Sequence, residues 1–196
     1  LNNTDLNSFL KKNKVIYLPP EKGPSASALK GLLSSSSYPT LLVTCDLPLL
    51  NTQQIDNYCR GMQNIEADFV VTAVSYSAII KDMPRLKKTK YKFGDSEVCF
   101  ANIFAVLREP GLKAIHYWQD IESSRKKPIE IIRKIDWLSI LRYKLGLLTL
   151  NGTAKRLSEK VGANLLIKNS DQASLAIDVD SKEDYEIFLD HFNKKN

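Results

Sequence analysis

The sequence has 196 residues, of which 43% are hydrophobic, a composition typical of globular proteins and too apolar for a disordered chain. No apolar run approaches the roughly 20 residues that cross a bilayer, and residues 1–14 do not resemble a secretory signal. The three cysteines and two histidines lack the spacing of a zinc site. The net charge of +6 favours an acidic ligand but is too small to single out nucleic acid. We therefore expect a soluble, cytoplasmic protein with no membrane or nucleic-acid partner.

In the first half of the chain, short apolar runs alternate with longer stretches of helical period, which indicates an α/β sheet. The run at 40–44 is typical of a strand buried on both faces. Asn51 has the position of a helix N-cap, with Gln54 as its capping-box partner. Consecutive strand–helix–strand units predict a parallel sheet. The expected elements are strands at 15–18, 40–44 and 69–74 and helices at 25–33 and 52–65.

The order of elements changes after Ser75, where two strands flank a turn at Gly94-Asp95. Asn151 is expected to cap a helix that Gly162 ends. No linker divides the chain, so residues 1–196 are expected to form one domain. The elements expected here are strands at 90–93, 98–106, 163–168 and 175–179 and helices at 112–122, 129–132, 137–145, 152–161 and 182–192.

The most informative segment is TLLVTCDLPLLN, residues 40–51. A buried strand ends by delivering Cys45 and Asp46, and Pro48 prevents the strand from continuing. Ligands of open parallel sheets bind outside the carboxyl ends of the strands, so Asp46 is expected where a ligand binds. A structural role for Asp46 is the alternative, and Cys45 is expected to be buried.

A second acidic segment is LAIDVDSKEDYE, residues 175–186. Asp178 and Asp180 are two apart on an expected strand, so their side chains would point to one face. Two carboxylates on one face repel each other unless a cation relieves them, and Mg²⁺ is commonly held by such carboxylates together with substrate phosphates. The alternatives are that one of the two faces solvent or that Asp180 caps the final helix.

A third segment, PPEKGPSASALKGL at 19–32, has a glycine, Gly23, and small residues at a helix start. Free amide groups at such a start suit a nucleobase or a phosphate, and they also suit an ordinary turn.

Two basic clusters complete the candidates. The first, between residues 85 and 92, is expected to be a solvated hairpin or loop. The second comprises Arg125, Lys126 and Lys127 before Pro128, and it could bind a phosphate of an acceptor substrate.

Four segments, taken together and in their order along the chain, resemble motifs of the MobA-like NTP transferases, the family that contains molybdenum cofactor guanylyltransferase. VTCDLPLL resembles the strand end "v-x-x-D-x-P-l-l", and EKGPSASALKGL resembles the helix "G-P-x-x-S-l-x-x-G-l". VCFANIFAVLRE resembles "x-x-N-i-f", and DVDSKEDYE resembles "D-i-D-T-P-E-D-l" with Ser-Lys in place of Thr-Pro. The resemblance extends from about residue 15 to about residue 192.

The resemblance implies a Rossmann-like, mainly parallel sheet flanked by helices, of the nucleotide-diphospho-sugar transferase type. It implies Mg²⁺ as the cofactor and an NTP and a small phosphorylated acceptor as partners, with release of pyrophosphate. By residue, it implies catalytic and metal-binding roles for Asp46 and Asp180. The remaining implied sites are the metal ligand Asp178, the base-pocket residues Gly23, Pro24 and Ser27, and Asn102 in the acceptor site beside Arg125 and Lys126.

The family's motif "L-A-G-G-x-G-x-R-M-G", which holds the triphosphate, has no counterpart in this sequence. The expectation is therefore an N-terminally incomplete enzyme that is inactive alone. Two alternatives are a glycosyltransferase that uses Asp178-Val179-Asp180 for a nucleotide-sugar metal, and a non-catalytic binding domain with the same sheet.

Overall fold

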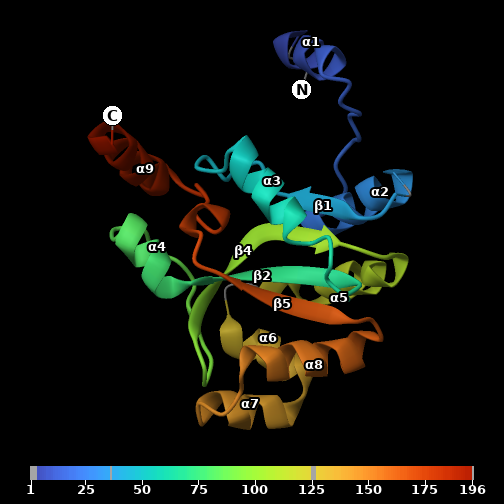
Figure 1. Ribbon diagram of the computed structural model, residues 1–196, viewed down its shortest axis with the longest axis vertical. Coiled ribbons are helices and arrows are strands. Elements are labelled where there is room, and N and C mark those ends of the chain that lie inside the picture. Colours follow the sequence, from blue (N-terminus) through green and yellow to red (C-terminus); the bar gives the residue numbers. More distant parts are fainter. Residues whose placement is uncertain (1–3, 36, 125–126, 196) are drawn as a thin grey trace.

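The computed structural model describes residues 4–35, 37–124 and 127–195 (Figure 1). Its centre is a five-stranded sheet with the strand order β1-β4-β2-β5, and β3 pairs with β4 off this path. None of the described helices combines the length and apolarity that crossing a bilayer requires. The strands are β1 (Thr40–Val43), β2 (Phe69–Ser75), β3 (Tyr91–Lys92), β4 (Glu97–Val106) and β5 (Leu165–Ser170). The helices are α1 (Thr4–Lys12), α2 (Pro24–Ser35), α3 (Thr52–Arg60), α4 (Tyr76–Asp82), α5 (Leu112–Ile121), α6 (Pro128–Ile135), α7 (Trp137–Lys144), α8 (Leu150–Val161) and α9 (Lys182–Lys195).

The direction of β4 determines the character of the sheet. β4 runs antiparallel to β1, β2 and β3, whereas β2 and β5 are parallel. The mixed α/β class expected from the sequence is confirmed, but the expected mainly parallel pairing is wrong. Periodicity identifies an element without identifying its neighbours, and in the structure β4 lies between β1 and β2. β1, β2 and β5 still share one direction, so their carboxyl ends face the same edge of the sheet.

β1 is an edge strand, and its exposure differs from the expectation. Three of its residues are partly buried and Val43 is exposed. The expectation that this strand is buried on both faces is therefore wrong. The reason is its place at the end of the strand order, where β4 is its one neighbour in the described sheet.

Two further segments that were expected to be strands form no ladder in the described structure. In residues 15–18 the apolar side chains of Val15, Ile16 and Tyr17 are exposed, and no described strand pairs with them. In the other segment, residues 175–179, Leu175 ends a 3-10 turn at Ala173–Leu175 and the following residues continue without strand pairing. Their apolar pattern comes from burial against the core rather than from a sheet.

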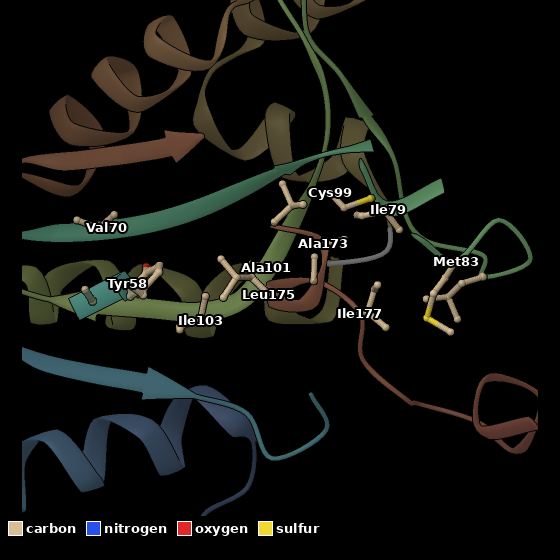
Figure 2. Packing of buried hydrophobic residues seen from close by; sticks show 14 of the residues in the cluster. Tyr58, Val70, Ile79, Met83, Cys99, Ala101, Ile103, Ala173, Leu175 and Ile177 are labelled. Carbon is tan, nitrogen blue, oxygen red and sulfur yellow. The ribbon is translucent and has the colours of Figure 1, made fainter. Parts of the chain in front are cut away.

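The main buried cluster fixes the path of the chain after that turn. Leu175 and Ile177 belong to the same cluster as Ala101 and Ile103 of β4 and Val70 of β2 (Figure 2). Full burial of a Leu or Ile side chain contributes about 1.5–3 kcal/mol. The residues that follow, including Asp178, are consequently held at a defined position beside β4.

Of the helix caps predicted from the sequence, two are confirmed by the structure and one is wrong. Asn51 and Gln54 form the expected capping box, with both hydrogen bonds at 3.0 Å. Gly162 ends α8 in the left-handed region with φ of 70°, as expected. The expected cap Asn151 is wrong, because the helix begins one residue before it and the Thr149 hydroxyl accepts the first-turn hydrogen bond.

Gly111, in the 3-10 turn between β4 and α5, lies close to the backbone just before β2. A Cβ at Gly111 would lie 2.3 Å from the carbonyl oxygen of Asp68, which accepts the amide of Leu107 at 2.9 Å. We expect Gly111→Ala to lower the free energy of unfolding by about 1–3 kcal/mol, because the backbone must shift. Urea denaturation measures this change.

The matched control is Gly31→Ala in α2, where an added Cβ meets no atom within 4 Å. Alanine is the better helix former, so this variant should keep the stability of the parent or gain up to about 1 kcal/mol. A Gly111→Ala protein as stable as the control would contradict the close approach to Asp68.

Candidate functional site

Three carboxylates meet at the carboxyl end of β1. Asp46 follows this strand, and Asp178 and Asp180 lie between the 3-10 turn at Ala173–Leu175 and α9. One oxygen from each carboxylate lies within 4.8 Å of the other two. Asp46 and Asp178 are partly buried and Asp180 is exposed. The structure therefore brings together the acidic residues of the two motifs, although more than 130 residues of sequence separate Asp46 from Asp178.

Backbone hydrogen bonds place these two segments side by side. The amide of Val179 donates to the carbonyl of Asp46 at 3.0 Å, and the amide of Thr44 donates to the carbonyl of Asn102 at 3.2 Å. The Thr44 hydroxyl donates to the Asp46 carboxylate. Leu47 is buried and anchors the turn. Asp46 is thus fixed between the edge of the sheet and the segment that carries Asp178.

Both oxygens of the Asp178 carboxylate have partners. The Asn102 side-chain amide donates to Oδ2 at 2.6 Å, and the Lys88 ammonium forms an ion pair with Oδ1. The ammonium also donates to the Asp178 carbonyl at 3.3 Å. The Lys88 and Asp178 side chains are only 14% and 15% exposed, so this ion pair is largely shielded from water. Asn102, which the resemblance placed in the acceptor site, supports an acidic residue in this structure.

Lys88 compensates only part of the negative charge that surrounds it. Burial lowers the pKa of the Lys88 ammonium, and the nearby carboxylates of Asp180 and Asp184, among other groups, raise it in part. One ammonium faces the three clustered carboxylates of Asp46, Asp178 and Asp180. Two negative charges remain uncompensated within this group, which is the charge that a divalent cation would neutralise.

Lys88 is the functional candidate that sequence analysis missed, because the cluster between residues 85 and 92 was expected to be solvated. Its neighbours behave as expected: Arg85 pairs with Asp190 at 2.7 Å and Lys90 with Glu97 at 3.0 Å, both on the surface. The available signal was Leu86, a buried residue two positions before Lys88. In an extended segment, residues two apart point to the same side.

The proposed base-pocket residues form a different set of contacts, at the start of α2. Pro24 is the first residue of the helix, and the Ser27 hydroxyl donates to the Gly23 carbonyl at 2.9 Å. The Ser25 hydroxyl donates to the Glu122 carboxylate, and a Cβ on Gly23 would lie 3.2 Å from the same carboxylate. A carboxylate therefore already lies beside this helix start, and the nucleotide-binding role of these residues stays a prediction.

Only Lys127 of the second basic cluster lies within the described residues. Arg125 and Lys126 lie outside the described residues. Lys127, which precedes α6, is exposed and pairs with Glu130 at 2.9 Å. Acceptor binding by Arg125 and Lys126 stays a prediction.

The three cysteines differ in a way that labelling can measure. Cys45 and Cys59 are exposed, which corrects the expectation that Cys45 is buried at the strand end. The turn after an edge strand leaves that side chain in solvent. Burial raises the pKa of the Cys99 thiol to about 11. At pH 8 its reactive thiolate fraction is therefore on the order of one in a thousand.

We expect a thiol reagent at pH 8 to label Cys45 and Cys59 rapidly and Cys99 only after denaturation. Mass spectrometry of the digested protein identifies the labelled positions. Rapid labelling of all three thiols in the folded protein would contradict the burial of Cys99, and protection of Cys45 would contradict its exposure.

The Lys88–Asp178 ion pair predicts non-additive effects on stability. Lys88→Met leaves three carboxylates without their cation and should lower the free energy of unfolding by about 3 kcal/mol. Asp178→Asn in the same chain should restore on the order of 1–2 kcal/mol of that loss, because it removes the unpaired charge. Urea denaturation of both single variants and the double variant measures the coupling.

Lys87→Met is the control, since the Lys87 side chain is 90% exposed and pairs only weakly with Glu183, at 3.9 Å. Its stability should equal that of the parent. Strictly additive losses in the Lys88 and Asp178 variants would show that the two side chains do not interact.

Comparison with known proteins establishes the fold. No family model and no curated protein matches this sequence. A solved structure of a hypothetical transferase from Thermus thermophilus is similar to it, with a TM-score of 0.72 and 23% sequence identity. The similarity covers 84% of this chain and 71% of that chain. The mixed sheet and its flanking helices are therefore an arrangement that this protein shares with that structure.

Proposed function

We propose that this chain belongs to a MobA-like nucleotidyltransferase of the nucleotide-diphospho-sugar transferase type, an enzyme that moves an NMP group from an NTP to a small phosphorylated acceptor. The chain alone has no counterpart of the family's triphosphate-binding motif, and we propose that it is inactive by itself. The observation that carries the proposal is the convergence of Asp46, Asp178 and Asp180 at the carboxyl end of β1. The fold shared with a hypothetical transferase adds support for group transfer.

Asp46 and Asp180 are the proposed ligands of Mg²⁺. Asp178 is less available because Asn102 and Lys88 occupy its two oxygens. Mg²⁺ usually takes one or two protein carboxylates and completes its coordination with water and substrate phosphates. When bound, it would neutralise charge on the phosphates of the NTP. Asp178 then acts as a positioning residue, since its partners hold the neighbouring Asp180 beside Asp46.

In the proposed reaction, an oxygen of the acceptor phosphate attacks the α-phosphorus of the NTP. The new bond joins this oxygen to the α-phosphorus, and the bond to the β-phosphate oxygen breaks to release pyrophosphate. The protein contributes orientation and charge neutralisation rather than a nucleophile. Gly23, Pro24 and Ser27 are the proposed contacts of the base, and Asn102, Arg125 and Lys126 those of the acceptor side.

A second candidate function is that of a non-catalytic ligand-binding domain, and Lys88 is the observation that favours it. A buried ammonium among carboxylates already supplies part of the positive charge that a metal would supply. In this case the cluster would be an internal salt-bridge network, and divalent cations would not bind there.

Metal titration distinguishes the two candidates. We expect the unmodified chain to bind one Mn²⁺ as a substitute for Mg²⁺, measured by loss of the free-ion signal in electron paramagnetic resonance. Asp46→Asn and Asp180→Asn should each weaken the affinity by about tenfold or more, because each removes a charged ligand. Addition of an NTP should strengthen binding to the unmodified chain, since its phosphates provide further ligands.

The matched control is Asp171→Asn, an exposed aspartate in the loop after β5, which should keep the affinity of the parent. Equal affinity in all variants would place the bound ion elsewhere. Absence of Mn²⁺ binding with and without NTP would refute the enzyme proposal and favour the non-catalytic domain.

A further inference from the structure

An exposed apolar surface covers α7 and the turn that follows it. In Figure 1, α7 lies at the lower end of the molecule, beside α6 and α8. The side chains of this surface, named here the α7 face, are between 41% and 71% exposed. They are Trp137, Leu138, Leu141, Leu145 and Leu147.

The helix itself is firmly attached to the protein, so the α7 face has a fixed orientation. Ser139 is fully buried and donates two hydrogen bonds of 2.7 Å to the Asp136 carboxylate, which pairs with Arg156 of α8 at 3.1 Å. The Tyr143 ring packs edge-on against Phe93 with a centroid distance of 5.9 Å. Since one side of α7 is anchored in this way, its other side is held in solvent.

The apolar side chains form one continuous stripe. Trp137, Leu141 and Leu145 follow each other at intervals of four residues, a spacing that places them on the same side of a helix. Leu138 lies three residues before Leu141 and widens the stripe. A contiguous apolar surface of this kind commonly marks a binding site.

Basic side chains accompany this stripe. Arg142 and Lys144 of α7 are exposed and take part in none of the ion pairs found among the described residues. Of the acidic residues around α7, Glu130 and Asp136 are already paired with Lys127 and Arg156. Asp95, whose neighbour Gly94 lies against the turn after α7, is exposed and accepts the Leu150 amide at 3.3 Å. The exposed cations outnumber this one unpaired carboxylate, so the α7 face combines apolar groups with net positive charge, and its complement is an apolar surface that carries negative charge.

We propose that the α7 face binds a membrane surface containing anionic phospholipids. Tryptophan and leucine flanked by Lys and Arg are the composition of interfacial helices, in which the apolar side enters the headgroup region and the cations contact lipid phosphates. Binding of this kind is peripheral and reversible. The inference is independent of the proposed transferase activity, and it revises the expectation from sequence that the chain has no membrane partner.

The size of the surface favours a lipid surface over a second copy of the chain. α7 has eight residues and is therefore about 12 Å long. A stable protein interface buries about 800 Å² on each partner, which is well beyond one side of a helix of this length. A membrane needs no complementary shape, so a short apolar stripe with cations is sufficient for weak binding.

Vesicle binding tests the proposal with the whole chain. We expect the protein to sediment with phosphatidylcholine vesicles that contain about 30% phosphatidylglycerol, and not with phosphatidylcholine alone, because the cations require negative lipid. Added salt at about 0.5 M should weaken the binding by screening. In a Trp118→Phe background Trp137 is the only tryptophan, and its emission should shift to shorter wavelength as it leaves water.

Two double variants and two controls locate the contact. Trp137→Gln with Leu141→Gln should reduce binding by about tenfold or more, and Arg142→Gln with Lys144→Gln by a comparable factor. The controls change similar residues elsewhere: Tyr185→Gln with Leu189→Gln on α9, and Lys155→Gln with Lys160→Gln on α8. Circular dichroism confirms that each variant is folded.

Three outcomes would overturn the proposal. The first is absence of binding to anionic vesicles, and the second is equal loss of binding in the control variants. The third is a dimer in analytical ultracentrifugation that Trp137→Gln with Leu141→Gln abolishes, which would assign the α7 face to a second copy of the chain.

Discussion

Charge compensation around Asp178 is the constraint on which the candidate site depends. Three carboxylates lie within 4.8 Å of one another, and such a group is stable only if cations or hydrogen-bond donors accompany it. Lys88 and Asn102 meet this requirement for Asp178, and they do so from separate parts of the chain, the loop before β3 and the strand β4. The charge of Asp178 is thereby compensated directly, and Asp46 and Asp180 are the two carboxylates that we propose as metal ligands.

The antiparallel strand β4 makes this arrangement possible. Because β4 lies between β1 and β2, Asn102 lies next to the end of β1 and faces the segment that follows β5. Leu175 and Ile177 also pack in one buried cluster with residues of this strand (Figure 2). A single element thus orders both acidic segments, one through backbone hydrogen bonds and the other through apolar burial and the Asn102 amide.

Sequence analysis anticipated the components of this structure better than their arrangement. The strands at β1, β2 and β4 and the capping box at Asn51 follow from local patterns, and the acidic residues were identified because they end apolar runs. The neighbours of β4 could not be inferred, since pairing depends on contacts between distant segments. The burial of Lys88 was missed for the same reason: its ionic partner lies 90 residues away, and the apolar Leu86 two positions before it was the one local signal.

The long sequence separations within the site have a consequence for how it forms. The contact of Lys88 with Asp178 spans 90 residues, and that of Asn102 with Asp178 spans 76. Closing loops of this length costs entropy that only the completed core repays. We therefore expect the acidic cluster to form only together with the completed core. A partly folded chain would lack the geometry of the cluster, even with every one of its residues present.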